Sequence, residues 1–131
     1  MNRSEIRSWL LENDVSKLRE LWERADNLRQ QYVGDEVHLR GLIELSNHCR
    51  RACHYCGLRA PNKGLPRYRL TEEEALTSAK RAASLGYNTV VLQAGEDTEL
   101  TQEWVSSLIK KIKKYTGLVV TLSLGERPAE E

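Results

Sequence analysis

The residues with the clearest chemical potential are three cysteines within eight positions, Cys49, Cys53 and Cys56, and the chain has no other cysteine. An odd number of clustered thiols is typical of a metal or redox site rather than of a disulfide framework. If the backbone loops around one centre, the three thiolates can bind it together. A four-iron cluster held by three thiolates leaves one iron open, as catalysis requires. A closed zinc site needs a fourth ligand, which His48 or His54 could supply.

Two other segments carry polar residues where functional groups could lie, a Gly95-Glu96 turn and the stretch Thr121–Glu126. The turn follows a short apolar run over about 88–93, and Thr121–Glu126 includes the end of another over about 118–123. Both runs are of the kind that forms buried strands in parallel sheets. The cysteines follow another predicted strand, over about 40–46. Because active groups of parallel sheets lie beyond the carboxyl ends of the strands, we expect the three segments to converge.

Helices are predicted around these strands from periodicity and capping residues. They run from Asn2 or Ser4 to Leu11, from Ser16 to about Tyr32, from Thr71 to about Leu85 and from about Thr101 to Tyr115. The order, helices followed by β-α-β-α-β, predicts an α/β fold with a parallel sheet. Non-periodic residues 47–69 are predicted to form a functional loop. In the second helix the spacing of the apolar residues predicts one buried stripe: Leu18, Leu21, Trp22, Ala25 and Leu28.

The composition is that of a globular domain, with 131 residues, 40% hydrophobic residues and 30% charged residues. The net charge of +1 and the 6% aromatic content argue against nucleic-acid binding. No run of eighteen apolar residues exists and no apolar stretch of signal-peptide length follows Met1, so we expect a cytoplasmic protein that binds no membrane.

The cysteine spacing, with an aromatic residue (Tyr55) just before the third cysteine, resembles the radical S-adenosylmethionine (SAM) superfamily. Within that superfamily the chain resembles the [FeFe]-hydrogenase maturases of the HydE type, in the biotin synthase-like group. The segments that carry this resemblance agree in order and spacing: Arg40–Asn47, Tyr55–Arg59, Arg67–Arg69, Val91–Asp97 and Thr121–Glu126.

The resemblance implies a [4Fe-4S] cluster and SAM as cofactors. Cys49, Cys53 and Cys56 would each bind one iron, and the amino and carboxylate groups of SAM would chelate the fourth. Tyr55 would lie near the adenine. The implied activity is reductive cleavage of SAM to a 5′-deoxyadenosyl radical, used in assembling the [FeFe]-hydrogenase active-site cluster.

Four further residues receive roles from the same resemblance. Gly95 would let the methionyl part of SAM approach the backbone, and the Glu96 carboxylate would accept hydrogen bonds from its ammonium. Thr121 and Ser123 would face the substrate cavity. Methylornithine synthase and biotin synthase-like enzymes remain alternatives within the superfamily, and a small Cys₃His zinc-binding interaction module remains one outside it.

Partners follow from the charge of the cysteine loop. Its basic residues are Arg50, Arg51, Arg59, Lys63, Arg67 and Arg69. They are either a solvated loop surface or a docking surface for an acidic electron donor, ferredoxin or flavodoxin. The resemblance also implies other hydrogenase maturation proteins as partners.

The domain organisation is predicted as an N-terminal helical extension, residues 1–36, followed by a partial radical-SAM barrel, residues 37–131. A complete (β/α)₈ barrel takes about 250 residues, so the three predicted strands correspond to the N-terminal part of a TIM-type barrel. We therefore expect a fragment truncated at its C-terminus that is inactive alone.

Overall fold

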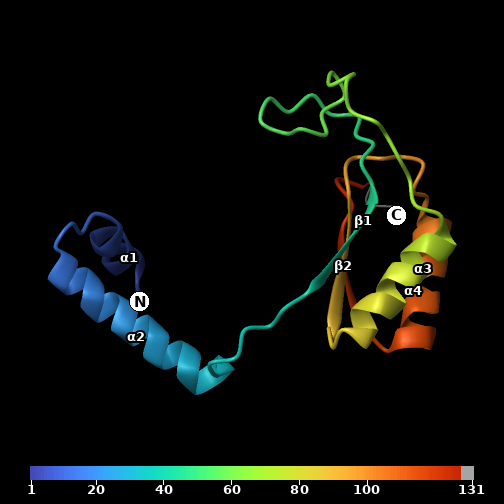
Figure 1. The fold of residues 1–131 in the computed structure, drawn as a ribbon. Helices are drawn as coiled ribbons and strands as arrows, with labels where there is room; N and C mark the ends of the chain where they lie inside the picture. Colours follow the sequence, from blue (N-terminus) through green and yellow to red (C-terminus); the bar gives the residue numbers. More distant parts are fainter. Residues whose placement is uncertain (128–131) are drawn as a thin grey trace. The chain divides into compact units, whose positions relative to one another are not determined.

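The computed structural model describes residues 1–127, and the last four residues of the predicted 37–131 domain lie outside this range. The chain divides after His38 into two units. The first holds α1 (Arg3–Leu10) and α2 (Val15–Val33). The second holds β1 (Gly41–Ser46), α3 (Glu72–Ser84), β2 (Thr89–Ala94), α4 (Gln102–Thr116) and β3 (Val119–Ser123) (Figure 1). The predicted element order is confirmed.

The helices of the first unit begin at short polar caps. Asn2 caps α1, whereas α2 is capped by Asp14 and not by the predicted Ser16, whose N–H donates to the Asp14 carboxylate over 2.8 Å. The predicted buried stripe on α2 is wrong. Trp22 and Leu28 are exposed, and no residue of α2 is buried. The reason is that the only other helix of this unit is α1, whose 8 residues are too few to cover a helix of 19.

The second unit is built on a parallel sheet with strand order β1-β2-β3. Both crossovers are helical, and α3 and α4 cover the same face of the sheet (Figure 1). Each strand therefore runs in the same direction, and all three carboxyl ends meet at one edge. No helix in the part of the chain that the structure describes is long and apolar enough to cross a membrane.

The hydrophobic core lies between this sheet face and the two helices. The core side chains with no exposed surface are Leu45, Val90, Leu92, Ala75, Ala79, Leu108 and Ile112. The predicted Thr71 capping box starts α3: the Glu74 N–H donates to the Thr71 hydroxyl, and the Glu74 carboxylate accepts from the Thr71 N–H.

The third strand differs from the prediction, because it is not buried on both faces. Val119 is 54% exposed and Leu122 is 53% exposed. The sheet order places β3 at an edge, where only β2 pairs with it among the described strands. Apolar sequence alone does not distinguish such an edge strand from a central one.

Candidate functional site

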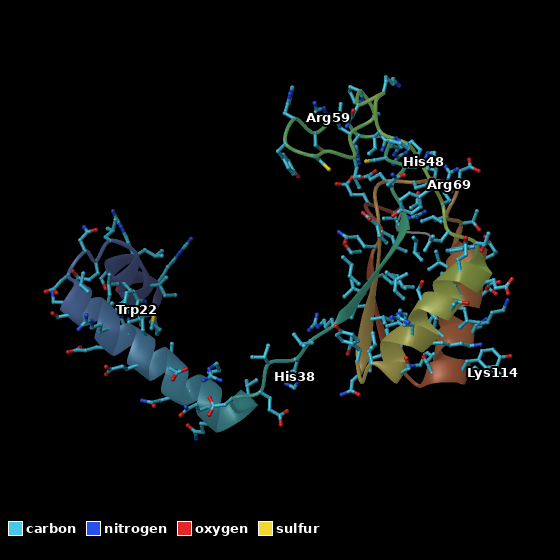
Figure 2. The ribbon with its side chains drawn as sticks, viewed as in Figure 1. Trp22, His38, His48, Arg59, Arg69 and Lys114 are labelled. Atoms are coloured by element: carbon cyan, nitrogen blue, oxygen red, sulfur yellow. The ribbon has the colours of Figure 1, made fainter. Side chains whose placement is uncertain are left out.

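The predicted convergence of functional segments is found at the carboxyl edge of the sheet. The loop of residues 47–69 follows β1, the Gly95-Glu96 turn follows β2, and residues 124–127 follow β3. Figure 2 shows His48, Arg59 and Arg69 together beyond this edge.

The loop is closed at its root by backbone pairing. The Leu70 N–H donates to the Leu45 carbonyl over 2.8 Å, and the Asn47 N–H donates to the Tyr68 carbonyl over 3.3 Å. The Asn47 side chain adds two bonds: its carbonyl accepts from the Tyr68 N–H (2.7 Å) and its amide donates to the Pro66 carbonyl (2.8 Å). The two ends of a long loop are thereby held side by side.

Arg67 stabilises the interior of the loop. Its guanidinium donates to the backbone carbonyls of Leu58 (2.8 Å), Arg59 (2.9 Å) and Asn62 (3.3 Å), and also to that of Asn47. A planar group with five donors suits this task, since it satisfies carbonyls that have no strand or helix partner. This arginine of the predicted basic surface is therefore a structural residue.

Cys49 packs directly on the Gly95-Glu96 turn. A Cβ atom added at Gly95 would lie 2.4 Å from the His48 carbonyl oxygen and 2.7 Å from the Cys49 Cβ. The Glu96 N–H donates to the Cys49 Sγ over 3.4 Å, and the Arg50 N–H donates to the Glu96 carbonyl over 3.1 Å. Glycine is required at position 95 because the backbones approach too closely for any side chain.

The Glu96 carboxylate lies between arginines. Arg51 Nε is 2.9 Å and Arg50 Nε is 3.2 Å from its two oxygens, and the Glu96 side chain is 13% exposed. Arg51 also pairs with Glu126, which follows β3. The hydrogen bond from Arg51 lowers the pKa of Glu96, so the carboxylate is ionised at neutral pH. This ion-pair group joins all three functional segments.

Asp97 is a buried carboxylate that was not among the predicted site residues. Its side chain is 2% exposed and receives Arg69 through two bonds, Nε over 2.6 Å and Nη2 over 2.8 Å. The Ser46 hydroxyl also donates to it over 2.6 Å. Burial raises the pKa of Asp97, but the bonds from Arg69 and Ser46 outweigh burial and bring it to about 2. No local spacing signals this contact, because the partners are 51 and 28 residues away.

Comparison with known proteins gives the family. No protein-family model matches the chain. The [FeFe] hydrogenase maturase subunit HydE of Thermotoga maritima is 48% identical over 128 residues, which cover 98% of this chain and 36% of that protein. The 3-methylornithine synthase of Methanosarcina acetivorans is 28% identical over 95% of this chain and 36% of that protein. The structure of methylornithine synthase (PylB) aligns with a TM-score of 0.81 at 28% identity, over 95% of this chain and 37% of that one.

The chain belongs to the radical SAM superfamily. The predicted fold class, the N-terminal part of a TIM-type barrel, is likewise confirmed. The hydrogenase maturase HydG, which is 24% identical, shares the fold with a TM-score of 0.82 over 93% of this chain and 28% of that one. The chain spans about a third of the length of the curated relatives that it matches.

The three thiols fit the iron–sulfur cluster of a radical SAM protein by their chemistry. All are free; Cys53 is exposed, and Cys49 and Cys56 are half-buried. Within residues 1–127 no three His, Cys, Asp or Glu side chains gather closely enough to hold a single ion. In a four-iron cluster each of the three thiolates binds its own iron, so the sulfurs need not surround one ion. A closed zinc site needs that arrangement and receives no support here.

The residue predicted near the adenine of SAM lies outside the packed part of the site. Tyr55 is 93% exposed. It lies in a turn in which the Cys56 N–H donates to the Cys53 carbonyl over 3.3 Å. The structure does not bring Tyr55 together with the Gly95-Glu96 turn.

The predicted substrate-facing residues share the sheet face that α3 and α4 leave uncovered. Ser123 is in register with Gln93, and Gln93 with Glu44, so these three side chains form a polar row across the strands. The Thr121 hydroxyl lies on the same face and donates to the Val90 carbonyl over 3.4 Å. Glu44 and Gln93 were not among the predicted site residues, although alternation within the strands could have identified them.

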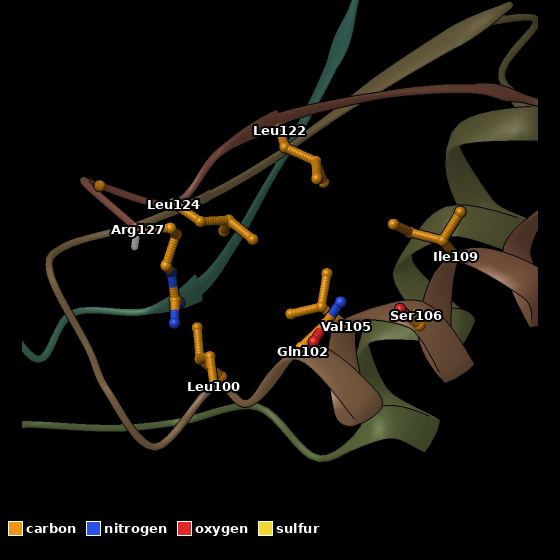
Figure 3. A pocket seen from close by; sticks show the side chains of 9 residues that line it. Leu100, Gln102, Val105, Ser106, Ile109, Leu122, Leu124 and Arg127 are labelled. Carbon is orange, nitrogen blue, oxygen red and sulfur yellow. The ribbon is translucent and has the colours of Figure 1, made fainter. Parts of the chain in front are cut away.

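Two cavities flank this edge of the sheet. The larger, about 320 Å³, lies between β3 and α4 and is lined mainly by apolar side chains, including Leu122, Leu124 and Ile109 (Figure 3). It contains no thiol and no carboxylate. The smaller, about 110 Å³, is lined by three residues of the ion-pair group, Arg50, Glu96 and Glu126, and by Asp97, Thr98, Leu124 and Arg127. The smaller one is the cavity relevant to the site, because it adjoins the residues predicted to bind SAM.

Proposed function

We propose that this chain forms the cluster- and SAM-binding part of a radical SAM enzyme of the HydE type, acting in assembly of the [FeFe]-hydrogenase active-site cluster. The observation that carries the proposal is the packing of Cys49 on the Gly95-Glu96 turn. It joins a thiol of the three-cysteine motif to a carboxylate able to bind an ammonium group. The 48% identity to HydE, against 28% to methylornithine synthase, supports the HydE type over the alternatives.

Cys49, Cys53 and Cys56 would hold the cluster. When bound, the cluster and SAM supply a one-electron reductive cleavage of SAM. The chain's own task is then to hold the thiolates at the end of β1 and to keep the loop closed, for which the bonds around Asn47 and Arg67 are suited.

Gly95 and Glu96 would orient the methionyl end of SAM. The space beside the bare Gly95 backbone is taken by the His48 carbonyl and the Cys49 Cβ, so Gly95 would act by letting the cysteine loop lie against the turn. The ionised Glu96 carboxylate would accept hydrogen bonds from an ammonium group. Arg50 and Arg51 hold this carboxylate in place in the present structure. An incoming ammonium would share it with them or replace one of them.

The uncovered sheet face would contribute to the substrate cavity. Thr121 and Ser123 supply hydroxyl groups there, and the register adds Gln93 and Glu44. The Tyr68 hydroxyl donates to the Glu44 carboxylate over 3.0 Å, which fixes the carboxylate at the end of the polar row. Donors and acceptors in such a row suit a small polar substrate.

An acidic electron donor such as ferredoxin or flavodoxin would dock near the cysteine loop. The side chains of Arg50 and Arg51 are 59% and 45% exposed although both pair with Glu96, and Lys63 is exposed on the same loop, so the loop presents positive charge. Arg67 and Arg69 are committed to the loop itself and to Asp97. Other hydrogenase maturation proteins would be partners of the complete enzyme.

Anaerobic reconstitution with iron and sulfide tests this function. The chain is expected to take up about four irons and to turn brown, with absorbance that dithionite bleaches. Cys53→Ala should abolish uptake while leaving the helix content by circular dichroism unchanged, because Cys53 is exposed. A colourless chain that instead holds one zinc through the thiols and His48 or His54 would overturn the proposal.

A further inference from the structure

Asp97 receives hydrogen bonds from both ends of the cysteine loop. Ser46 is the last residue of β1, just before the loop, and Arg69 stands at the loop's far end, where the two form an isolated antiparallel bridge. Asp97 itself follows the Gly95-Glu96 turn. One carboxylate therefore holds the entry of the loop, its exit and the neighbouring turn.

The hydrogen bonds that the Asp97 side chain accepts fix its position and its orientation. The Arg69 guanidinium donates two parallel hydrogen bonds to the Asp97 carboxylate, and the Glu99 N–H donates a third to the Oδ1 atom over 3.2 Å. Both carboxylate oxygens thus accept hydrogen bonds, and the Asp97 side chain is only 2% exposed. Charge-assisted bidentate pairs fix orientation as well as distance. An exposed ion pair of the same type has no such effect, because solvent competes with it.

A short path of contacts leads from Asp97 to the first thiol. The Ser46 hydroxyl donates to Asp97 and accepts from the His48 N–H over 3.1 Å. The His48 carbonyl is the atom packed most closely on Gly95, and Cys49 follows directly. Movement of Ser46 would therefore shift His48 and open the contact between Cys49 and the turn.

We propose that Asp97 is a positioning residue that, through Ser46 and Arg69, fixes Cys49 against the Gly95-Glu96 turn. Its significance for catalysis rests on the proposed function, but the positional claim concerns the chain's own contacts. Cys49 is the thiol that Asp97 controls, and Cys53, which is exposed in the middle of the loop, is independent of it.

Thiol alkylation of the metal-free chain tests the claim. Iodoacetamide is added under anaerobic conditions, and the rate at each cysteine is followed by mass spectrometry. In Asp97→Asn, which keeps the shape but loses the charge, the rate at Cys49 is expected to rise about tenfold, as for loss of a hydrogen bond to a charged group. The rate at Cys53 should stay within about twofold. Ser46→Ala should raise the Cys49 rate by a smaller factor.

Asp35→Asn is the matched control, since it removes an Asp–Arg pair of the same chemistry, Asp35 with Arg29, at an exposed place. It should leave every thiol rate unchanged. Equal rates at Cys49 in wild type and Asp97→Asn would overturn the proposal. A joint rise at Cys49, Cys53 and Cys56 would also overturn it, because it would show general loosening of the fold.

Iron uptake separates this inference from the proposed function. If the wild-type chain binds iron and sulfide, Asp97→Asn should bind them with a broadened or shifted electron paramagnetic resonance (EPR) signal of the reduced cluster. If the wild-type chain binds none, the proposed function fails, while the alkylation pattern still decides the role of Asp97.

Discussion

Replacing Gly95 by alanine should separate the cysteine loop from the turn that follows β2. The backbone at Gly95 has no positive φ, so alanine meets no conformational strain there. Its cost is purely steric, because the new Cβ would lie 2.4 Å from the His48 carbonyl oxygen. Real Cβ atoms do not approach closer than 3.0 Å, and a backbone carbonyl cannot rotate away as a flexible side chain can.

The size of the effect follows from this distance. The His48 carbonyl must retreat from 2.4 Å to at least 3.0 Å, and the 3.4 Å bond from the Glu96 N–H to Cys49 Sγ lengthens with it. Overpacking of this kind costs about 1–3 kcal/mol. With a urea dependence of about 2 kcal/mol per molar, a loss of about 2 kcal/mol lowers the unfolding midpoint by about 1 M.

Urea unfolding followed by circular dichroism measures the loss, and Gly57→Ala is the control. Gly57 lies in the same loop, next to Cys56, and a Cβ there would meet nothing within 4 Å. This control should change the free energy of unfolding by less than about 0.5 kcal/mol. Equal midpoints for Gly95→Ala and Gly57→Ala would refute the close packing of Cys49 on the turn.

Three further predictions concern the scaffold. Asp97 has a pKa of about 2 in the folded chain against 3.8 ordinarily, so it contributes about 2 kcal/mol of stability above pH 3.8, and this contribution is lost as the pH falls towards 2. Urea titrations at several pH values should show this loss of stability in the wild-type chain. The same loss in Asp97→Asn would contradict the assignment to Asp97. Thr71→Ala removes the α3 cap and should cost about 1 kcal/mol by thermal unfolding, whereas Thr77→Ala, exposed in the same helix, should cost nothing. Leu92→Ala should cost about 3 kcal/mol, and Leu42→Ala, 62% exposed on the neighbouring strand, well under 1 kcal/mol; similar losses would show that the core is misplaced.

Local signals were sufficient to predict the elements and the convergence of the three segments at one edge of the sheet. The Thr71 capping box and the helix-ending Gly117, with a φ of +69°, act within one turn of chain and need no tertiary information. The parallel order of the strands then placed Cys49 near Glu96, because crossovers of one hand bring all carboxyl ends to one edge.

Contacts between distant residues could not be predicted in the same way. The pairing of Asp97 with Ser46 and Arg69 depends on how the loop returns to the sheet, and neither residue type nor spacing specifies that return. The predicted burial was also wrong for Trp22 on α2 and for Leu122 on β3, which are both exposed. Periodicity gives the apolar side of an element but not which other element covers it.

The most direct test of the central claim is EPR spectroscopy of the reduced, reconstituted chain with and without SAM. A cluster held by Cys49, Cys53 and Cys56 would keep one iron free for the amino and carboxylate groups of SAM, and Glu96 is the residue proposed to receive the amino group. SAM should therefore change the spectrum of the wild-type chain, and should change it only at a higher concentration in Glu96→Gln. A cluster whose spectrum is the same in the presence of saturating SAM would contradict the account.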